Sequence, residues 1–460
     1  MPDRPNILLL FTDDQRAGTI GALGNPHIHT PNLDALVRRG TAYTQAYIMG
    51  GSCPAVCMPS RAMLMTGRTL FGLQGQGESI PRDHTLLGEH LRRHGYATWG
   101  TGKWHNGPEA YARSFSGGAE IFFGGMDDHW NVPACDFDPT GRYEARPMTR
   151  DPWRSNAIAQ RRCDHIRPGV HSSELFAEAT VGFLRSYQDD APFFAYVSFM
   201  APHDPRTMPP EYLAMYDPDR IELPPNAYAA HPFDNGELVV RDELLAARPR
   251  VPGEIRRHLA EYYAMISHLD AQIGRILAAL EASGHAEDTL VLLAGDNGLA
   301  LGQHGLMGKQ NLYDHSLHVP LVMAGPGVPH GEQREAPCYL LDLFPTLCDL
   351  TALPTPASVQ GRSLAPTLAD PSARPRQALY FAYRDYQRAV QNGTHKLIEY
   401  CVDGVRHTQL YDRGADPWEL NSVADLPSGA DTRAHLTTAL LQARAEMGDR
   451  SPGFWGTYGA

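Results

Sequence analysis

Three long apolar runs constrain the fold of this chain more than any other feature of its sequence. They cover residues 6–11 (NILLLF), 193–200 (FFAYVSFM) and 289–294 (TLVLLA). A continuous apolar run is typical of a strand buried on both faces, as in a parallel sheet covered by helices. Residues 173–187 and 254–283 have the apolar periodicity of such helices. The sequence therefore predicts an α/β fold with a large, mainly parallel sheet flanked by helices.

Polar side chains follow each of these predicted strands. They are Asp13 and Asp14 after the first, His203 after the second, and Asp296 and Asn297 after the third. A shorter strand, 96–100, leads to Lys103 and His105, which lie on one face of an extended chain because they are two residues apart. Ligands of open α/β sheets bind beyond the carboxyl ends of the strands. We therefore expect these residues to meet at one site.

The acidic residues of this set suit a hard cation. Asp13, Asp14, Asp296 and Asn297 offer only oxygen atoms, which favour Ca²⁺ or Mg²⁺ over zinc. Each pair also has an ordinary interpretation, solvated acids in a turn for the first and an Asn-Gly turn for the second. The metal hypothesis therefore depends on the two pairs lying together.

A cysteine stands where a helix is predicted to begin. Residues 57–68 read CMPSRAMLMTGR. Pro59 suits the first helical position and Gly67 is a stop signal. Cys57 would then precede a helix N-terminus, whose free N–H groups attract anions, and Arg61 adds a positive charge. We expect a thiolate or a bound oxyanion here, and the alternative is a buried structural cysteine.

The Cys-Met-Pro-Ser-Arg segment, with Thr-Gly-Arg after it, resembles the signature of type I sulfatases of the alkaline phosphatase-like superfamily. Met65 stands where that family usually has leucine. Further segments resemble the family in the same order, namely Gly-Lys-Trp-His at 102–105, Pro-His-Asp-Pro at 202–205, Asp-Asn-Gly at 296–298, and Lys309. The resemblance covers residues 5–350.

This resemblance implies a hydrolase that converts a sulfate ester into an alcohol and inorganic sulfate. A formylglycine-generating enzyme would convert Cys57 into formylglycine, whose hydrate is the nucleophile and a ligand of the cation, Ca²⁺ or alternatively Mg²⁺. Asp13, Asp14, Asp296 and Asn297 would be the other ligands. The implied catalytic roles are to hold the hydrate (Arg61), to neutralise sulfate oxygens (Lys103 and Lys309), to assist sulfate release (His105) and to protonate or stabilise the leaving alcohol (His203).

A second, smaller domain is predicted at the C-terminal end. Residues 353–377 are rich in proline, alanine and serine, as in a connector. Four short strands follow between 378 and 412, with hairpin signals at Asn392-Gly393 and Asp403-Gly404. We expect a catalytic domain over 1–365, and over 366–460 a small antiparallel sheet with a closing helix.

Two irregular regions, 106–170 and 204–253, are expected to be loops at the rim of the site, where specificity often resides. The first contains weaker pocket candidates, Asp127, Asp128, His129 and Trp130.

Composition excludes several classes of protein. A net charge of −12 argues against nucleic-acid binding. The sequence has no run of the ~20 apolar residues that a membrane span needs, and its seven scattered cysteines predict no disulfide framework. No signal-peptide pattern precedes the first strand. We expect a cytoplasmic protein if Met1 is the native start, and a periplasmic or secreted one if a signal peptide was removed.

Two alternatives and several details remain open at the level of sequence. A phosphonate monoester or phosphodiester hydrolase of the same superfamily could use the same residues, and a catalytically silent metal-binding homologue could keep the fold. The ester could be a carbohydrate, aryl or small alkyl sulfate. The oligomeric state is not predicted.

Overall fold

The computed structural model describes residues 4–151 and 155–459, and its centre is an eight-stranded sheet. The strand order is β12 (Glu332–Arg334), β2 (Thr41–Tyr43), β11 (Leu321–Ala324), β10 (Thr289–Gly295), β1 (Asn6–Thr12), β9 (Phe193–Ser198), β5 (Ala97–Lys103) and β6 (Gly117–Phe122). Only β11 runs antiparallel to its neighbours, β10 and β2. The predicted mainly parallel sheet is therefore confirmed.

The three apolar runs form the middle of this sheet. β1 pairs in parallel with β9 on one side and β10 on the other, and all residues of these three strands are buried. Because successive side chains of a strand point to opposite faces, Leu8 and Leu10 enter one core cluster, and Ile7 and Leu9 enter another.

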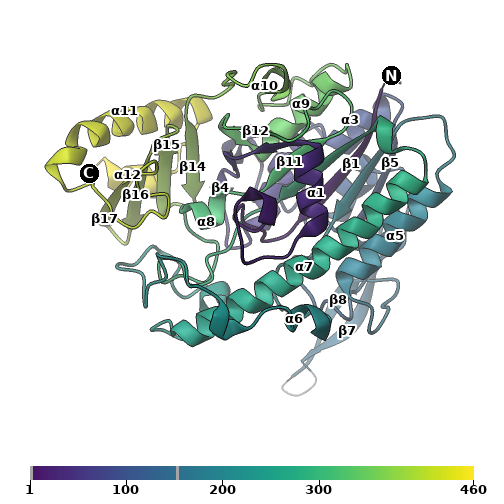
Figure 1. Cartoon of the computed structure of the whole chain (residues 1–460), viewed down its shortest axis with the longest axis horizontal. Helices are drawn as coiled ribbons and strands as arrows, with labels where there is room; N and C mark the ends of the chain where they lie inside the picture. Colours follow the sequence, from purple (N-terminus) through teal and green to yellow (C-terminus); the bar gives the residue numbers. More distant parts are fainter. Residues whose placement is uncertain (1–3, 152–154, 460) are drawn as a thin grey trace.

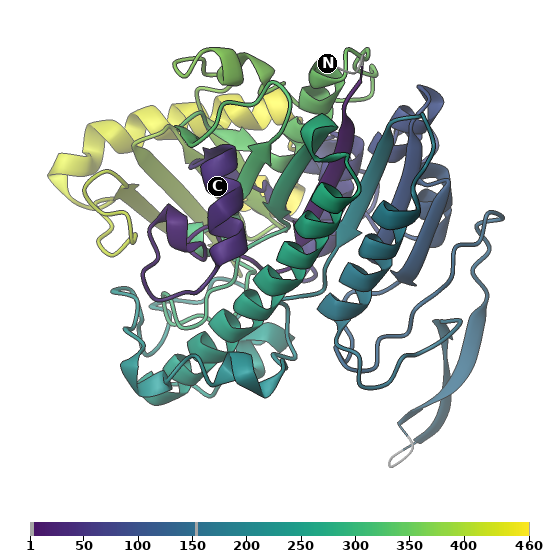
Figure 2. The same ribbon diagram turned by 45° about the vertical axis from the view of Figure 1, so that its right-hand side comes forward.

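Helices cover both faces, as Figures 1 and 2 show. On the face of Leu8 and Leu10 lie α1 (Pro31–Arg39), α5 (Ser172–Ser186) and the long α7 (Pro252–Ala282). On the opposite face lie α2 (Cys57–Thr66), α3 (Leu87–Arg93) and α9 (Leu343–Leu350). Because helices cover both faces of the sheet, a binding site can form at its edges or at the ends of its strands.

A second sheet forms the C-terminal part of the molecule. The predicted antiparallel strands are β14 (Leu379–Tyr383), β15 (Gln387–Gln391), β16 (His395–Val402) and β17 (Val405–Asp412), packed against α11 (Ala430–Met447) and α12 (Pro452–Tyr458). A fifth strand, β4 (Gly50–Gly51), pairs in parallel with β14. The edge of the small sheet is therefore built from residues that precede Cys57.

Two local expectations were wrong. Region 106–170 is not merely irregular, since it contains α4 (Pro108–Ser114), the edge strand β6 and a hairpin of β7 (Ala145–Asp151) and β8 (Ser155–Arg162) that projects from the body (Figure 2). The sequence did not predict these strands, because the glycine-containing β6 and the polar hairpin lack the apolar pattern of a strand. Helix α2 begins at Cys57 itself, so Pro59 is its third residue.

Candidate active site

Four oxygen-bearing side chains meet where β1 and β10 end. These strands are in register, with Thr12 opposite Gly295, so the residues that follow them are neighbours. The Asp14 amide donates to Asp296 Oδ1 at 3.0 Å, and Asn297 Nδ2 donates to Asp14 Oδ1 at 2.6 Å. Asp14 adopts the left-handed conformation (φ 64°), which turns it back toward β10. Asp13, Asp14, Asp296 and Asn297 are all buried.

This cluster fits a hard divalent cation. Among the described residues, Asp13 Oδ1 and Asn297 Oδ1 are buried and accept no hydrogen bond. A buried oxygen without a partner costs about 1–3 kcal/mol, which a bound cation would remove. Ligand atoms of Asp13, Cys57 and Asp296 lie within 4.8 Å of one another, as do those of Asp13, Asp14 and His203. The donors are mainly oxygens, which suits Ca²⁺ or Mg²⁺.

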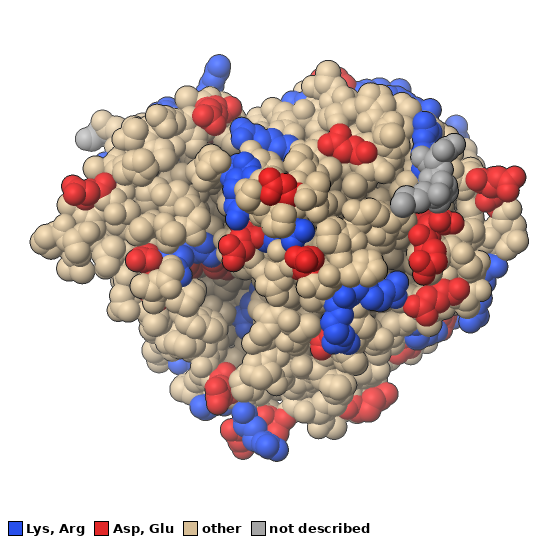
Figure 3. Space-filling model, turned by 45° about the horizontal axis from the view of Figure 1, so that its top comes forward, with Lys and Arg blue, Asp and Glu red and all other residues tan. Residues whose placement is uncertain are grey.

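Three cationic side chains compensate the three carboxylates. Lys103 contacts Asp13, and Lys309 Nζ lies 2.5 Å from Asp14 Oδ1. Arg61 Nη2 lies 3.0 Å from Asp13 Oδ2 and 2.9 Å from Asp296 Oδ2. A bound divalent cation would leave this interior with excess positive charge, which suits an anionic substrate. On the face shown in Figure 3, by contrast, acidic and basic side chains are interspersed at the surface.

Arg61 is held by residues that the sequence analysis did not identify. Its Nη1 donates to Ser198 Oγ at 2.5 Å and to Tyr196 Oη at 3.3 Å, and its guanidinium lies over the Phe11 ring. Ser198 and Tyr196 belong to the apolar run of β9 and point to the same face. A polar residue within a buried strand was the one signal that could have indicated them.

Cys57 lies among the cations, but its burial disfavours a thiolate. Its Sγ is 3.5 Å from Lys103 Nζ and 3.4 Å from His105 Nδ1. Burial raises the pKa of this thiol to about 11, and Asp13 and Asp296 act in the same direction against the lysines. Burial therefore opposes the expected thiolate, and it outweighs the lowering effect of Lys103 and Lys309 on this pKa.

Lys103 and His105 follow a bend in β5 that only glycine permits. Gly102 has φ 84°, and a Cβ there would lie 1.9 Å from the Ser198 carbonyl oxygen. Burial lowers the pKa of His105 well below its usual value, and Lys103 and Arg61 contribute in the same direction, so the ring is neutral. The Gly-Lys-Trp-His segment therefore brings a buried lysine and a half-buried histidine to Cys57.

His203 lies beside the acid cluster. Its Nε2 is 3.7 Å from Asp14 Oδ2, and its Nδ1 is 2.7 Å from the Asp204 carbonyl oxygen, which makes Nδ1 the donor. His129 donates from Nε2 to the His203 carbonyl oxygen at 3.0 Å. His129 is fully buried, its Nδ1 is 2.6 Å from Ser172 Oγ, and burial lowers its pKa to about 4.

The other weak candidates of the 127–130 segment make their described contacts with residues outside this cluster. Asp127 pairs with Arg161 of the projecting hairpin, and Asp128 accepts from the Trp130 amide in a local turn. The Trp130 ring packs edge-on against His171. Among the described contacts, His129 is the member of the segment that bonds a predicted site residue, His203.

The fold and the site together define a class. A buried acid cluster at the carboxyl end of a mainly parallel sheet, facing lysine, arginine and cysteine, is the arrangement of a metal-dependent hydrolase that acts on an anionic ester. A family model named sulfatase matches residues 5–353, and a model of the C-terminal region of N-sulphoglucosamine sulphohydrolase matches residues 302–446.

The chain belongs to the sulfatase family and is a sulfuric ester hydrolase of alkaline phosphatase-like fold. An ulvan-active sulfatase of Formosa agariphila is 27% identical and covers 97% of this chain and 82% of its own. A protein solved in complex with its substrate D-glucosamine-2-N,6-O-disulfate has a TM-score of 0.75 at 22% identity, over 98% of this chain and 99% of the other.

A phosphonate monoester hydrolase of Agrobacterium radiobacter is similar as well. Its structure matches with a TM-score of 0.73 at 25% identity, over 96% of both chains. The sulfatase family in general carries a metal ion and a formylglycine, and the residues described above fit both. Across residues 4–151 and 155–459, no helix has the length and apolar character to cross a bilayer.

Proposed function

We propose that this sulfatase uses Cys57, after conversion to formylglycine, as the source of its nucleophile. The observation that carries the proposal is the position of the Cys57 side chain, within 3.5 Å of Lys103 Nζ and His105 Nδ1 and beside an acid cluster with two unpartnered oxygens. A formylglycine-generating enzyme would act on the chain during maturation, before Cys57 is enclosed.

The metal in this proposal is Ca²⁺, with Mg²⁺ as the alternative. Asp13, Asp14, Asp296 and Asn297 would hold it, together with the modified side chain of residue 57. When bound, the two groups supply an activated hydroxyl and a positive charge that stabilises charge developing in the transition state.

The cationic side chains bind and orient the sulfate group. In the structure Lys103 forms an ion pair with Asp13, and Lys309 forms one with Asp14. If these carboxylates held a divalent cation, the two ammonium groups would be free to bind sulfate oxygens. Arg61 stays fixed by Ser198 and Tyr196, so it can hold the side chain of residue 57 in one orientation.

Protons move through Asp296 and two histidines. Asp296 lies beside Cys57 and would accept the first proton from the nucleophile. His203 Nδ1 donates to the Asp204 carbonyl, which leaves Nε2 to carry a proton to the leaving alcohol. His105 Nδ1 faces the side chain of residue 57 and would take the proton that accompanies sulfate release.

The substrate in this proposal is the sulfate ester of a carbohydrate. An ulvan-active sulfatase and a protein solved with a sulfated glucosamine support it, because they match almost the whole chain. The rim would come from 106–170 and 204–253 and from residues 366–460, which we propose as a C-terminal domain beside a catalytic domain of 1–365.

A sulfate-release screen tests the function. The protein is produced together with a formylglycine-generating enzyme, and release of inorganic sulfate is measured from carbohydrate, aryl and alkyl sulfates. The expected result is turnover of a carbohydrate sulfate that Cys57→Ala abolishes. Absence of turnover on all three classes, with Cys57 shown to be converted, would leave a catalytically silent homologue.

One observation favours a second activity. The phosphonate monoester hydrolase matches at 25% identity, and a site with excess positive charge does not distinguish the two anions. Comparing kcat/KM for a sulfate ester and for a phosphonate monoester with the same leaving group decides between them. We expect the sulfate ester to be preferred, and a preference for the phosphonate monoester would reverse the assignment.

A further inference from the structure

A short 3-10 helix in the region 204–253, η4 (Arg241–Leu245), bonds two segments of the active site at once. It begins with three charged residues, Arg241, Asp242 and Glu243. The side chains of Asp242 and Glu243 are buried, whereas Arg241 and Leu244 are exposed. Buried charged groups are normally held by partners, so the partners of these residues indicate what the helix does.

Arg241 holds the segment that carries His203. Its guanidinium forms a two-pronged ion pair with Asp204, in which Nη1 lies 2.8 Å from Oδ1 and Nη2 contacts Oδ2. The Asp204 carbonyl oxygen accepts the Nδ1–H of His203 at 2.7 Å, and Asp204 Oδ1 lies 3.5 Å from the same nitrogen. A two-pronged arginine–carboxylate pair fixes orientation as well as distance. Arg241 therefore holds the residue that orients the His203 ring.

Asp242 holds the segment that carries Lys309. Its Oδ2 accepts from Gln310 Nε2 at 2.7 Å, and Gln310 Oε1 accepts from the Lys309 amide at 3.0 Å. Gln310 Nε2 also donates to the carbonyl oxygen of Pro54, three residues before Cys57, at 2.8 Å. The buried Gln310 amide thus joins the lysine segment to the cysteine segment, and Asp242 fixes the direction in which this amide points.

Glu243 fixes the helix itself to the turn that precedes Lys309. Its carboxylate accepts from the Gly308 amide at 2.8 Å and from the Met307 amide at 3.0 Å, and it forms an ion pair with Arg250. Bonds from a carboxylate to backbone amides are charge-assisted and strong. The position of η4 relative to the lysine segment is therefore well defined.

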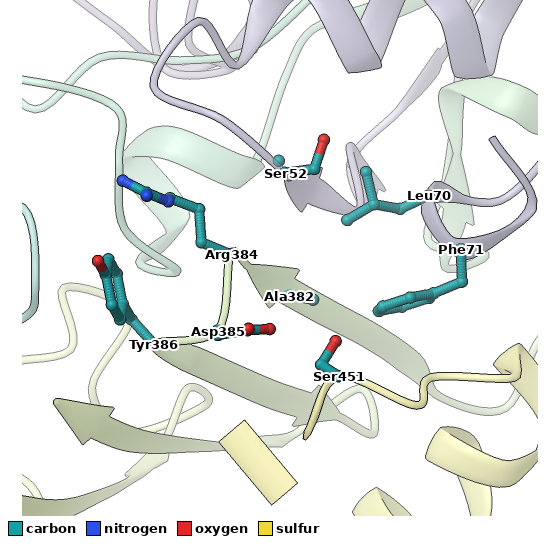
Figure 4. Close-up of a pocket in the computed structure, with 9 residues that line it drawn as sticks. Ser52, Leu70, Phe71, Ala382, Arg384, Asp385, Tyr386 and Ser451 are labelled. Carbon is teal, nitrogen blue, oxygen red and sulfur yellow. The ribbon is translucent and has the colours of Figure 1, made fainter. Parts of the chain in front are cut away.

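The small C-terminal sheet holds the residues just before η4. Glu237 Oε1 accepts from Tyr383 Oη at 3.0 Å and lies 2.5 Å from Arg384 Nη1. Figure 4 shows Arg384 extending from the turn after β14, in the direction opposite to the Asp385 side chain. The rim segment is thus bonded to the small sheet at residue 237 and to the catalytic domain at residue 243, with Arg241 and Asp242 between these two positions.

We propose that Arg241 and Asp242 are positioning residues of the sulfatase reaction. Arg241 orients the leaving-group acid, His203, by holding its neighbour in the chain. Asp242 orients the sulfate-binding Lys309 through the glutamine that follows it. The inference rests on the proposed function, because the roles of His203 and Lys309 belong to that function. It predicts that two adjacent residues of one helix affect different parts of the reaction.

The test uses two substrates that share one ring shape, phenyl sulfate and 4-nitrophenyl sulfate. Phenolate is the more basic leaving group, so phenyl sulfate depends more on acid assistance. The variants are Arg241→Gln, Asp242→Ala, the reference His203→Ala and the control Leu244→Ala, which shortens an exposed side chain of the same helix. For each protein we would measure kcat/KM on both substrates, the inhibition constant of inorganic sulfate, bound metal and the melting temperature.

We expect Arg241→Gln to lower kcat/KM about tenfold for phenyl sulfate and less than about twofold for 4-nitrophenyl sulfate, since only part of the acid assistance of about 10²–10⁴-fold is lost. The inhibition constant of sulfate should not change. Arg241→Lys keeps the charge without the two-pronged geometry and should recover part of the loss.

Asp242→Ala should lower kcat/KM about tenfold for both substrates and raise the inhibition constant of sulfate about tenfold, which corresponds to weakening one hydrogen bond to a charged group. Asp242→Asn keeps the volume and an acceptor oxygen, so it should show the same pattern with a smaller loss. Leu244→Ala should change none of these quantities.

Two results would overturn the inference while leaving the proposed function intact. They are equal losses on the two substrates for Arg241→Gln when His203→Ala distinguishes them, and an unchanged inhibition constant of sulfate for Asp242→Ala. Loss of bound metal in either variant would also overturn it, because the effect would then come from the metal site. Equal losses for His203→Ala itself would instead refute the proposed acid role, and the role of Arg241 with it.

Discussion

Replacement of His203 by alanine should affect substrates according to their leaving groups. His203 Nδ1–H donates to the Asp204 carbonyl at 2.7 Å, and His129 donates to the His203 carbonyl. The other ring nitrogen, Nε2, points to the acid cluster and lies 3.7 Å from Asp14 Oδ2. A positioned general acid contributes about 10²–10⁴-fold in rate, which corresponds to about 3–5 kcal/mol. The help matters most when the leaving alkoxide is strongly basic.

We therefore expect His203→Ala to lower kcat/KM for an alkyl or sugar sulfate by about 10²–10⁴-fold, and for 4-nitrophenyl sulfate by less than about tenfold. His105→Ala, which acts on sulfate release after the alcohol has left, should lower kcat equally for both substrates once that step limits turnover. The assay is steady-state kinetics on both substrates with both variants. Equal losses of kcat/KM across leaving groups for His203→Ala would refute the acid role and leave His203 as a residue that binds sulfate or maintains structure.

Three further predictions follow from the geometry. Asp296→Asn keeps the shape of the side chain but removes its charge, so the variant should lose both bound metal and activity while its melting temperature stays near that of the unaltered protein. Metal analysis of the unaltered, active protein checks the oxygen site, and stoichiometric zinc without calcium or magnesium would contradict it. His129→Ala should reproduce the leaving-group pattern of His203→Ala with a smaller loss, because it acts through the His203 carbonyl; a loss that is independent of the leaving group would indicate a general packing defect. Burial lowers the pKa of several histidines from 6.5 to about 4, among them His129, His231, His258 and His268. The unfolded chain binds protons at these positions below pH 6.5 while the folded chain does not, so each should lower the free energy of unfolding by up to about 1.4 kcal/mol per pH unit between pH 6.5 and 4. Thermal melts at pH 7.5, 6 and 5 check this, and a midpoint that does not fall toward pH 5 would contradict it.

The central sheet was predictable because its strands carry a strong physical signal. A run such as residues 290–294 has no polar residue, which is typical of a strand buried on both faces. The pairs that follow these strands, Asp13-Asp14 and Asp296-Asn297, could be predicted to meet since parallel strands bring their carboxyl ends to one edge. The predicted hairpins of the small sheet depended on Asn-Gly and Asp-Gly turns, which carry an equally local signal.

What the sequence did not predict depends on contacts between distant segments. The two-residue strand β4 has no pattern of its own and is defined only by its pairing with β14. The roles of Ser198 and Tyr196 depend on Arg61, over 130 residues away. The raised pKa of Cys57 could not be inferred from a helix terminus, because burial is its largest cause and Asp13 and Asp296 add to it.

The most direct test of the account is the relation between modification of Cys57 and sulfate release. Preparations with different degrees of conversion are made by varying the supply of formylglycine-generating enzyme. Mass spectrometry of the peptide that contains Cys57 gives the fraction that has lost its thiol, and sulfate release from the best substrate gives the activity of the same sample. The account predicts activity proportional to the converted fraction and none at zero conversion. Normal activity in fully unmodified protein would contradict it.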